Sequence, residues 1–242
     1  MKFYSSFDLK HQIWHWLGRY PNGLRLIDYY VKIKRLDISV SSNKTDLVIE
    51  GYPRSANTIT VAAFRVANQN KINIAHHVHG SAQVLIASKY NIPCLVLLRN
   101  PMKAVVSLHI RNNKINIYQA LRNYIEFYKD IYPLSDSFVA VDFYEIINGF
   151  DSVVKKVNDK YGCSFNPLGI SVNNSAPVIS EVKIMDLRDN PTRNGGEYTV
   201  GLPSKKRQSM ADKLYLMIEN DNVLSKMLDQ ANDIKNKILS KQ

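Results

Sequence analysis

The chain of 242 residues is 45% hydrophobic and 22% charged, which is enough apolar content to bury a full core, and we expect one globular domain. Lysine and arginine outnumber aspartate and glutamate by 32 to 21, and the formal charge of +11 favours anionic partners without choosing among them. The two cysteines, Cys94 and Cys163, belong to no CxxC or Cys/His cluster, which argues against a zinc site and indicates a reducing cytoplasm.

Residues 1–44 are expected to form an N-terminal helical segment. They contain no secretion signal and no apolar run near the roughly 20 residues that span a bilayer. Ile13, Trp14, Trp16 and Leu17 recur at helical spacing. We expect this stripe to pack against the rest of the domain, and peripheral membrane contact is the alternative.

Residues 45–162 form the predicted nucleotide-binding core, in which short apolar segments alternate with helical ones. The expected strands are "DLVIEGY", "INIAHHVH", "PCLVLLRN" and "SFVAVDF", and the expected helices are 57–69, 81–90, 101–112 and 116–131. Such alternation predicts an α/β fold in three layers, with a mainly parallel central sheet and helices on both faces. Residues 163–205 are predicted to be a long loop and 206–242 one or two amphipathic helices.

The stretch "LVIEGYPRSANTIT" has the pattern of a strand, a tight turn and a helix, which commonly holds a phosphate. The GxxxxGK[ST] signature of nucleotide hydrolases is incomplete, because Ala56 and Asn57 replace its second glycine and its lysine. Ser55, Asn57 and Thr58 still supply donors at a helix start, and Arg54 supplies a fixed charge. These residues suit one phosphate beside a breaking bond better than a triphosphate with magnesium. An ordinary turn capped by Ser55 or Asn57 is the alternative.

A second element, "LVLLRNPMKAVVSLHIR", ends a strand at Arg99 and starts a helix at Asn100 and Pro101. Ser107 lies about two helical turns further on. Arginine and a hydroxyl in these places could hold a second phosphate from two sides, because guanidinium offers paired donors at any physiological pH. Taken alone, the element also fits a surface arginine beside a helix cap.

Taken together, the two elements resemble the PAPS-dependent sulfotransferases, where PAPS is 3′-phosphoadenosine-5′-phosphosulfate. "GYPRSANT" resembles their sulfate-proximal loop, and "RNPMKAVVS" resembles their 3′-phosphate motif, in which arginine and serine stand eight residues apart. Order, separation and strand context match from about Asp46 to His109. The likeness is weaker for "VDFYEII" and for "PTRNGGEYT", which is similar to a late RxG stretch of the family.

The resemblance implies transfer of a sulfuryl group from PAPS to a hydroxyl or amine, with no required metal. Arg54 would stabilise the leaving phosphate, and Arg99 with Ser107 would bind the 3′-phosphate. The nucleotide-binding residues that it implies are Arg54, Ser55, Ala56, Asn57, Thr58, Arg99, Ser107, Arg193, Asn194 and Gly195. The acceptor, a small molecule or a glycan, does not follow from the sequence.

Three histidines compete for the role of general base that a hydroxyl acceptor requires. If "INIAHHVH" is a strand, His76 shares a face with Ile74 and Val78 and is packed, whereas His77 and His79 share the other face. We predict His79, because it lies at the carboxyl end of the strand, where ligands bind in open parallel sheets. His77 is the alternative, as is a structural role for all three.

Two other functions fit parts of the sequence. An ATP- and magnesium-dependent kinase is supported by Asp142 at the end of "FVAVD", and a non-catalytic anion- or glycan-binding relative by the changes at Ala56 and Asn57. Nucleic-acid binding has no recognised module, and the "PSKKRQ" run is interpreted as a solvated face or a loop contact. Tyr124, Tyr128 and Tyr132 share a helix face and are expected in the core, with an acceptor cleft as the alternative.

Overall fold

The computed structural model describes residues 8–33, 39–189 and 205–242. A sheet of parallel strands lies at its centre, with the order β2-β1-β3-β4. The strands are β1 (Leu47–Gly51), β2 (Ile74–His76), β3 (Cys94–Leu98) and β4 (Val139–Asp142). The predicted α/β class and the parallel sheet are therefore confirmed.

Ten α-helices and two short 3-10 helices surround this sheet within the described residues. The α-helices are α1 (Leu9–Gly18), α2 (Pro21–Ile33), α3 (Asn57–Ala67), α4 (Ser81–Lys89), α5 (Pro101–Arg111), α6 (Ile117–Ile131), α7 (Phe143–Tyr161), α8 (Ala176–Asp189), α9 (Lys205–Glu219) and α10 (Asn222–Leu239). The 3-10 helices are η1 (Tyr132–Ser137) and η2 (Val172–Asn174).

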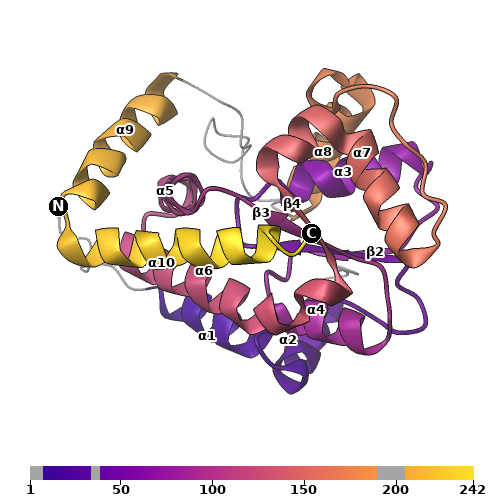
Figure 1. Ribbon diagram of the computed structural model, residues 1–242, viewed down its shortest axis with the longest axis horizontal. Coiled ribbons are helices and arrows are strands. Elements are labelled where there is room, and N and C mark those ends of the chain that lie inside the picture. The colour runs from indigo at the N-terminus through magenta and orange to yellow at the C-terminus, as the bar shows by residue number, and fades with distance from the viewer. Residues whose placement is uncertain (1–7, 34–38, 190–204) are drawn as a thin grey trace.

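The helices form a layer on each face of the sheet, as predicted (Figure 1). Leu47 and Ile49 point into the core beneath α3, α7 and α8, whereas Val48 points into the core shared with α4, α6 and α10. Alternate side chains of one strand are thus buried on opposite faces, which is why these strands are continuous apolar runs in the sequence.

The N-terminal helices pack on α4, but the apolar stripe of α1 is only partly buried. Trp14 and Leu17 contact the small core formed with α2 and α4, while Ile13 and Trp16 are 50% and 59% exposed. The expected packing therefore holds for Trp14 and Leu17 and fails for Ile13 and Trp16, because each exposed residue lies about 100° around the helix from the packed residue that follows it. None of the helices in the described ranges is long and apolar enough to cross a membrane.

The segment 163–205, predicted to be a loop, contains helix α8. Val178 and Met185 are buried against α3 and α7, whereas Ile184 and Leu187 are exposed. Apolar residues therefore occur around the whole of α8, and the sequence lacks the one-sided periodicity that predicts an amphipathic helix. Helix α7, which no predicted element covered, bends at Gly149.

Candidate functional site

The turns that carry the predicted functional residues meet at one edge of the sheet. They follow the carboxyl ends of β1, β2 and β3, and Ile49 of β1 lies in register with both His76 of β2 and Leu95 of β3. Strand β1 has β2 on one side and β3 on the other, so the strand order reverses at this point. Open α/β sheets bind ligands in the crevice beside such a reversal.

The turn between β1 and α3 is closed by its own polar groups. The Ser55 backbone N–H and the Asn57 side-chain amide both donate to the Tyr52 carbonyl, each at 3.2 Å. Arg54 and Ala56 have positive φ angles of 73° and 74°, a conformation that costs a residue other than glycine about 1–2 kcal/mol. Strain of this kind is concentrated at functional sites in proteins.

Helix α3 begins at this turn without a side-chain cap. Its N-cap is Ala56, which has no side-chain acceptor, whereas α5 and α6 are capped by Asn100 and Asn116. The first N–H groups of an uncapped helix and its dipole attract an anion. The side chains of Ser55 and Asn57, which were predicted to bind a phosphate, are buried.

The β3–α5 turn is bonded directly to the first one. Nη1 of Arg99 donates to the Arg54 carbonyl at 2.6 Å, and Nε of Arg54 donates to the Ser107 hydroxyl at 3.0 Å. The Arg99 guanidinium also lies 4.5 Å from the ring centre of Phe143. The structure thus brings Arg54, Arg99 and Ser107 into one cluster, although Ser107 contacts Arg54 rather than Arg99.

The cluster retains a polar donor that a ligand would satisfy. Nε of Arg99 is buried and has no hydrogen-bond partner in the described part of the chain. A buried donor on a charged group is expensive to leave unpaired. This donor, the uncapped helix and the arginines fit a phosphate-bearing ligand.

Positive charge accumulates around Arg54. Burial lowers its pKa, and the charges of Arg111, Arg207 and Arg99 lower it further, while Asp186 opposes them. Burial also lowers the pKa of Arg99. Both shifts mean that the charged forms are held at an electrostatic cost, and a bound anion would relieve it.

Arg111 and Arg207 were not singled out in the sequence. Arg207 belongs to the "PSKKRQ" run, for which a solvated face or a loop contact is predicted, yet it is only 8% exposed and lies on a helix. Its helix, α9, packs against α5, and this contact brings Arg207 to the site from a distant part of the chain. No local pattern could have indicated that approach.

Buried tyrosines hold the two turns in place. The Tyr128 hydroxyl donates to the Leu97 carbonyl at 2.6 Å and accepts from the Tyr52 N–H at 3.2 Å. The Tyr124 hydroxyl donates to the Arg99 carbonyl at 2.8 Å. Tyr124 and Tyr128 are fully buried, so the core position expected for them is confirmed, and their hydroxyls also fix the ends of β1 and β3.

The histidine segment leaves the strand earlier than predicted. Strand β2 ends at His76, and His77 and His79 have positive φ angles of 60° and 54°. The predicted alternation therefore fails after His76, which is fully buried as expected. The strand stops because the N–H groups of Val78 and His79 donate to the Glu50 carboxylate at 3.1 Å each instead of pairing with β1.

Glu50 is a site residue that the sequence analysis missed. Its side chain is fully buried and also accepts from the Gln83 amide at 2.6 Å. Burial raises the pKa of Glu50 to about 8, against the effect of its hydrogen bonds. A single glutamate in the apolar strand "LVIEG" was the signal available, because buried carboxylates are rare without partners.

His79 presents one ring nitrogen as an acceptor. Its Nδ1 lies 2.9 Å from the Gly51 carbonyl, which can only accept, so Nδ1 carries the proton and Nε2 keeps its lone pair. Burial lowers the pKa of His79 to about 4, aided by the charge of Arg111. The side chain is 25% exposed, so the neutral imidazole can be reached from solvent.

Helix α1 packs closely against the histidine segment. The Trp14 indole N–H donates to the Val78 carbonyl at 3.3 Å. A Cβ atom at Gly80 would lie 2.5 Å from the Gly18 carbonyl oxygen, so glycine is required where α1 meets this turn. The N-terminal helices therefore help to fix the position of His79.

Four predicted residues are not part of the cluster as described. Arg193, Asn194 and Gly195 fall outside the described residues. Asp142, the candidate magnesium aspartate, accepts from the Tyr144 N–H as the cap of α7 and pairs with Lys235 at 2.8 Å. Over the described ranges, no cluster of acidic, histidine and cysteine side chains could hold a metal ion.

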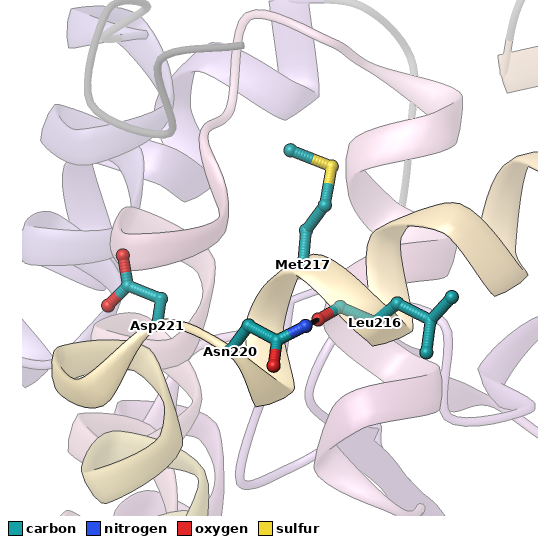
Figure 2. Close-up of a pocket in the computed structure, with 4 residues that line it drawn as sticks. All are labelled: Leu216, Met217, Asn220 and Asp221. Atoms are coloured by element: carbon teal, nitrogen blue, oxygen red, sulfur yellow. Dashed lines mark hydrogen bonds between the residues drawn. The ribbon is translucent and has the colours of Figure 1, made fainter.

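A hollow of about 370 Å³ at the turn between α9 and α10 is lined by none of these residues (Figure 2). It is lined by Leu216, Met217, Asn220 and Asp221. Its polar groups are used by the helix ends, because the Asn220 amide donates to the Leu216 carbonyl and Asp221 caps α10. This hollow therefore offers no chemistry of its own.

Comparison with known proteins adds little to this geometry. No protein-family model matches the sequence, and no curated protein matches it. Among solved structures, the chain is similar to mouse sulfotransferase SULT7A1 complexed with PAP, at 10% identity, 79% coverage of this chain, 90% coverage of that chain and a TM-score of 0.37. So low a score assigns neither fold nor activity to this chain.

Proposed function

We propose that this protein is a sulfotransferase that moves a sulfuryl group from PAPS to a hydroxyl or amine. The observation that carries the proposal is the bonded cluster of Arg99, Arg54 and Ser107 at the carboxyl edge of the sheet. These residues belong to the two motifs that resemble the family, and they converge although they are separated in sequence. Two phosphate-holding elements suit a donor that carries phosphate at both its 3′ and 5′ positions.

The chain supplies a separate group for each part of the transfer. The uncapped start of α3, with Thr58, holds the 5′-phosphate, and Arg99 and Ser107 hold the 3′-phosphate. The bond between sulfur and the phosphate oxygen breaks, and a bond forms between sulfur and the acceptor oxygen. Arg54 stabilises the negative charge that the departing phosphate gains.

His79 takes the proton of the acceptor. Its Nε2 lone pair is available because Nδ1–H is bonded to the Gly51 carbonyl. Gly51 directly precedes the turn that carries Arg54, so the base and the phosphate site are joined through one short segment. Glu50 fixes this geometry by binding the backbone of His79. Because burial lowers its pKa to about 4, His79 is neutral at pH 7 and Nε2 is unprotonated before the acceptor reacts.

The kinase alternative loses its main support, because Asp142 is a helix cap with a lysine partner. The proposal is tested by incubating the protein with PAPS, EDTA and a panel of sugar, phenol, lipid-alcohol and peptide acceptors. We expect PAP and a sulfated product to form with at least one acceptor class, and His79→Asn to slow the formation of both by about 10²–10⁴. Phosphorylation of an acceptor from ATP and magnesium, without PAPS turnover, would contradict it.

A further inference from the structure

A series of hydrogen bonds connects helix α8 with the first turn of helix α3. Nη1 of Arg65 lies 3.5 Å from the Glu181 carboxylate on α8, and Nη2 of Arg65 lies 3.1 Å from Nε2 of His76. Nδ1 of His76 is hydrogen-bonded to Nδ1 of His77. Nε2 of His77 lies 2.9 Å from the Thr58 hydroxyl, in the first turn of α3.

The donor and the acceptor of each hydrogen bond in this series follow from Arg65. Arginine can only donate, so Nε2 of His76 accepts and the proton of the neutral ring is on Nδ1. That Nδ1–H donates to Nδ1 of His77, which places the proton of His77 on Nε2. His77 in turn donates to the Thr58 oxygen, whose own hydrogen has no acceptor in the described part of the chain.

We propose that Arg65, His76 and His77 form a one-way donor relay that fixes the Thr58 hydroxyl as a hydrogen-bond donor to a phosphate oxygen of the nucleotide. The identity of that acceptor rests on the proposed function, whereas the direction of the relay does not. His77 is then a positioning residue. It cannot serve as the base, because both of its ring nitrogens are engaged.

The surroundings of the two rings keep them neutral, as the relay requires. Burial lowers the pKa of both His76 and His77 well below the ordinary value of 6.5, and the charge of Arg65 adds to the effect on each. His76 is fully buried, so its ring is enclosed by protein atoms. The neutral pair transmits the donor direction of Arg65 over the length of two imidazoles.

The relay is tested first in the wild-type protein without any ligand. Two-bond proton–nitrogen NMR correlations of ¹⁵N-labelled histidine rings at pH 7.5 report which nitrogen carries the proton. We expect the Nδ1–H tautomer for His76 and the Nε2–H tautomer for His77, unchanged in Arg65→Lys, which preserves a donor. The opposite tautomer at either residue, or an imidazolium, overturns the relay whether or not the protein binds a nucleotide.

A double-mutant cycle then tests the effect on the anion. Thr58→Val should weaken PAP binding roughly 10- to 100-fold, because a hydrogen bond to a charged oxygen is lost, and Thr58→Ser should retain it. Arg65→Met should cause most of the same loss alone, but almost none in a Thr58→Val background. Losses that multiply would overturn the relay. If the wild-type protein binds no PAP, the proposed function fails, and the tautomers still decide the relay.

Discussion

The backbone carbonyl of Arg54 accepts a hydrogen bond of 2.6 Å from the guanidinium of Arg99, so a side chain of the β3–α5 turn holds the backbone of the β1–α3 turn. Two segments 45 residues apart in the sequence are thereby fixed at one point of the sheet edge. The remaining Nε of Arg99 is buried without a partner in the described residues. The bond explains why the positions of the two arginines depend on each other.

Replacing these arginines should separate binding from turnover. Arg99→Ala should weaken PAP binding roughly 10- to 100-fold, because a phosphate loses a charge-assisted partner. Arg54→Ala should lower kcat by about 10²–10³ with a smaller effect on affinity, and Arg54→Lys should be tolerated. Calorimetry and steady-state kinetics measure the two effects. Lys103→Ala, which removes an exposed charge from the same helix as Ser107, is the control for non-specific electrostatics.

If Arg54→Ala changed only the KM for PAPS, its catalytic role would be withdrawn. If Lys103→Ala lost as much PAP affinity as Arg99→Ala, the effect of Arg99 would be explained by net charge and not by a direct contact with the phosphate.

Loss of the proposed base should affect chemistry and not nucleotide binding. His79→Asn should lower kcat by about 10²–10⁴ while PAP affinity persists. Because burial lowers the pKa of His79 to about 4, the acid limb of the kcat/KM profile should fall well below pH 6.5. His77→Asn is the matched comparison, and it should weaken PAP binding. Near-normal turnover in His79→Asn beside a folded, inactive His77→Asn would move the base to His77.

The protein should be more stable with glycine in place of Ala56. Its φ of 74° strains an alanine by about 1–2 kcal/mol, and the greater freedom of glycine in the unfolded chain offsets about half of that gain. We expect Ala56→Gly to raise the free energy of unfolding by roughly 0.5–1 kcal/mol in urea titrations. Ala62→Gly, inside the same helix, should lower it by about 1 kcal/mol or more. Equal losses in both variants would show that the turn is unstrained.

Stability should fall as the protein is acidified. Burial lowers the pKa of a group of histidines, to about 4 where a value is resolved: His11, His15, His76, His77 and His79. The unfolded chain takes up protons on these groups near pH 6.5, whereas the native state does not, so the free energy of unfolding decreases from about pH 6.5 towards 4.

Glu50 has the opposite effect on the free energy of unfolding. Because its pKa is raised to about 8 in the native state, the unfolded chain loses the Glu50 proton first, and stability decreases as pH rises from about 4.5 to 8. One group opposes several, so the acid loss should dominate, with a shallow decline between pH 6.5 and 8. Urea unfolding at pH 5, 6, 7 and 8 measures the slope. Equal stability at pH 5 and pH 7 would contradict the buried, neutral state of the histidines.

The sequence predicted the sheet and its neighbouring helices because their signals are local. The apolar run of β3 and the Asn100-Pro101 start of α5 each suffice to place an element. The end of β2 depends instead on a carboxylate from another strand, Glu50, which captures two backbone N–H groups. Such a contact exists only after β1 and β2 have paired, so no pattern within "INIAHHVH" reveals it.

The residues of the candidate site also differ in whether local sequence patterns reveal them. Arg54 and Arg99 were found from motifs, because each stands at a strand end with a recognisable spacing. Arg207 was missed because it approaches from α9, and His77 and His79 could not be distinguished because their roles depend on which nitrogen carries the proton. Tautomers are set by partners from other segments, here the Gly51 carbonyl and the relay from Arg65.

The most direct test of the proposed function is the thermal stability of the protein with different nucleotides. PAP carries both phosphates that the two turns are proposed to hold, and a hundredfold excess over Kd should stabilise the native state by about 2.7 kcal/mol. We predict a clear rise of Tm with PAP that EDTA leaves unchanged, and no comparable rise with ATP and magnesium or with GTP. A rise with ATP and magnesium equal to that with PAP, and abolished by EDTA, would contradict a sulfotransferase and favour a kinase.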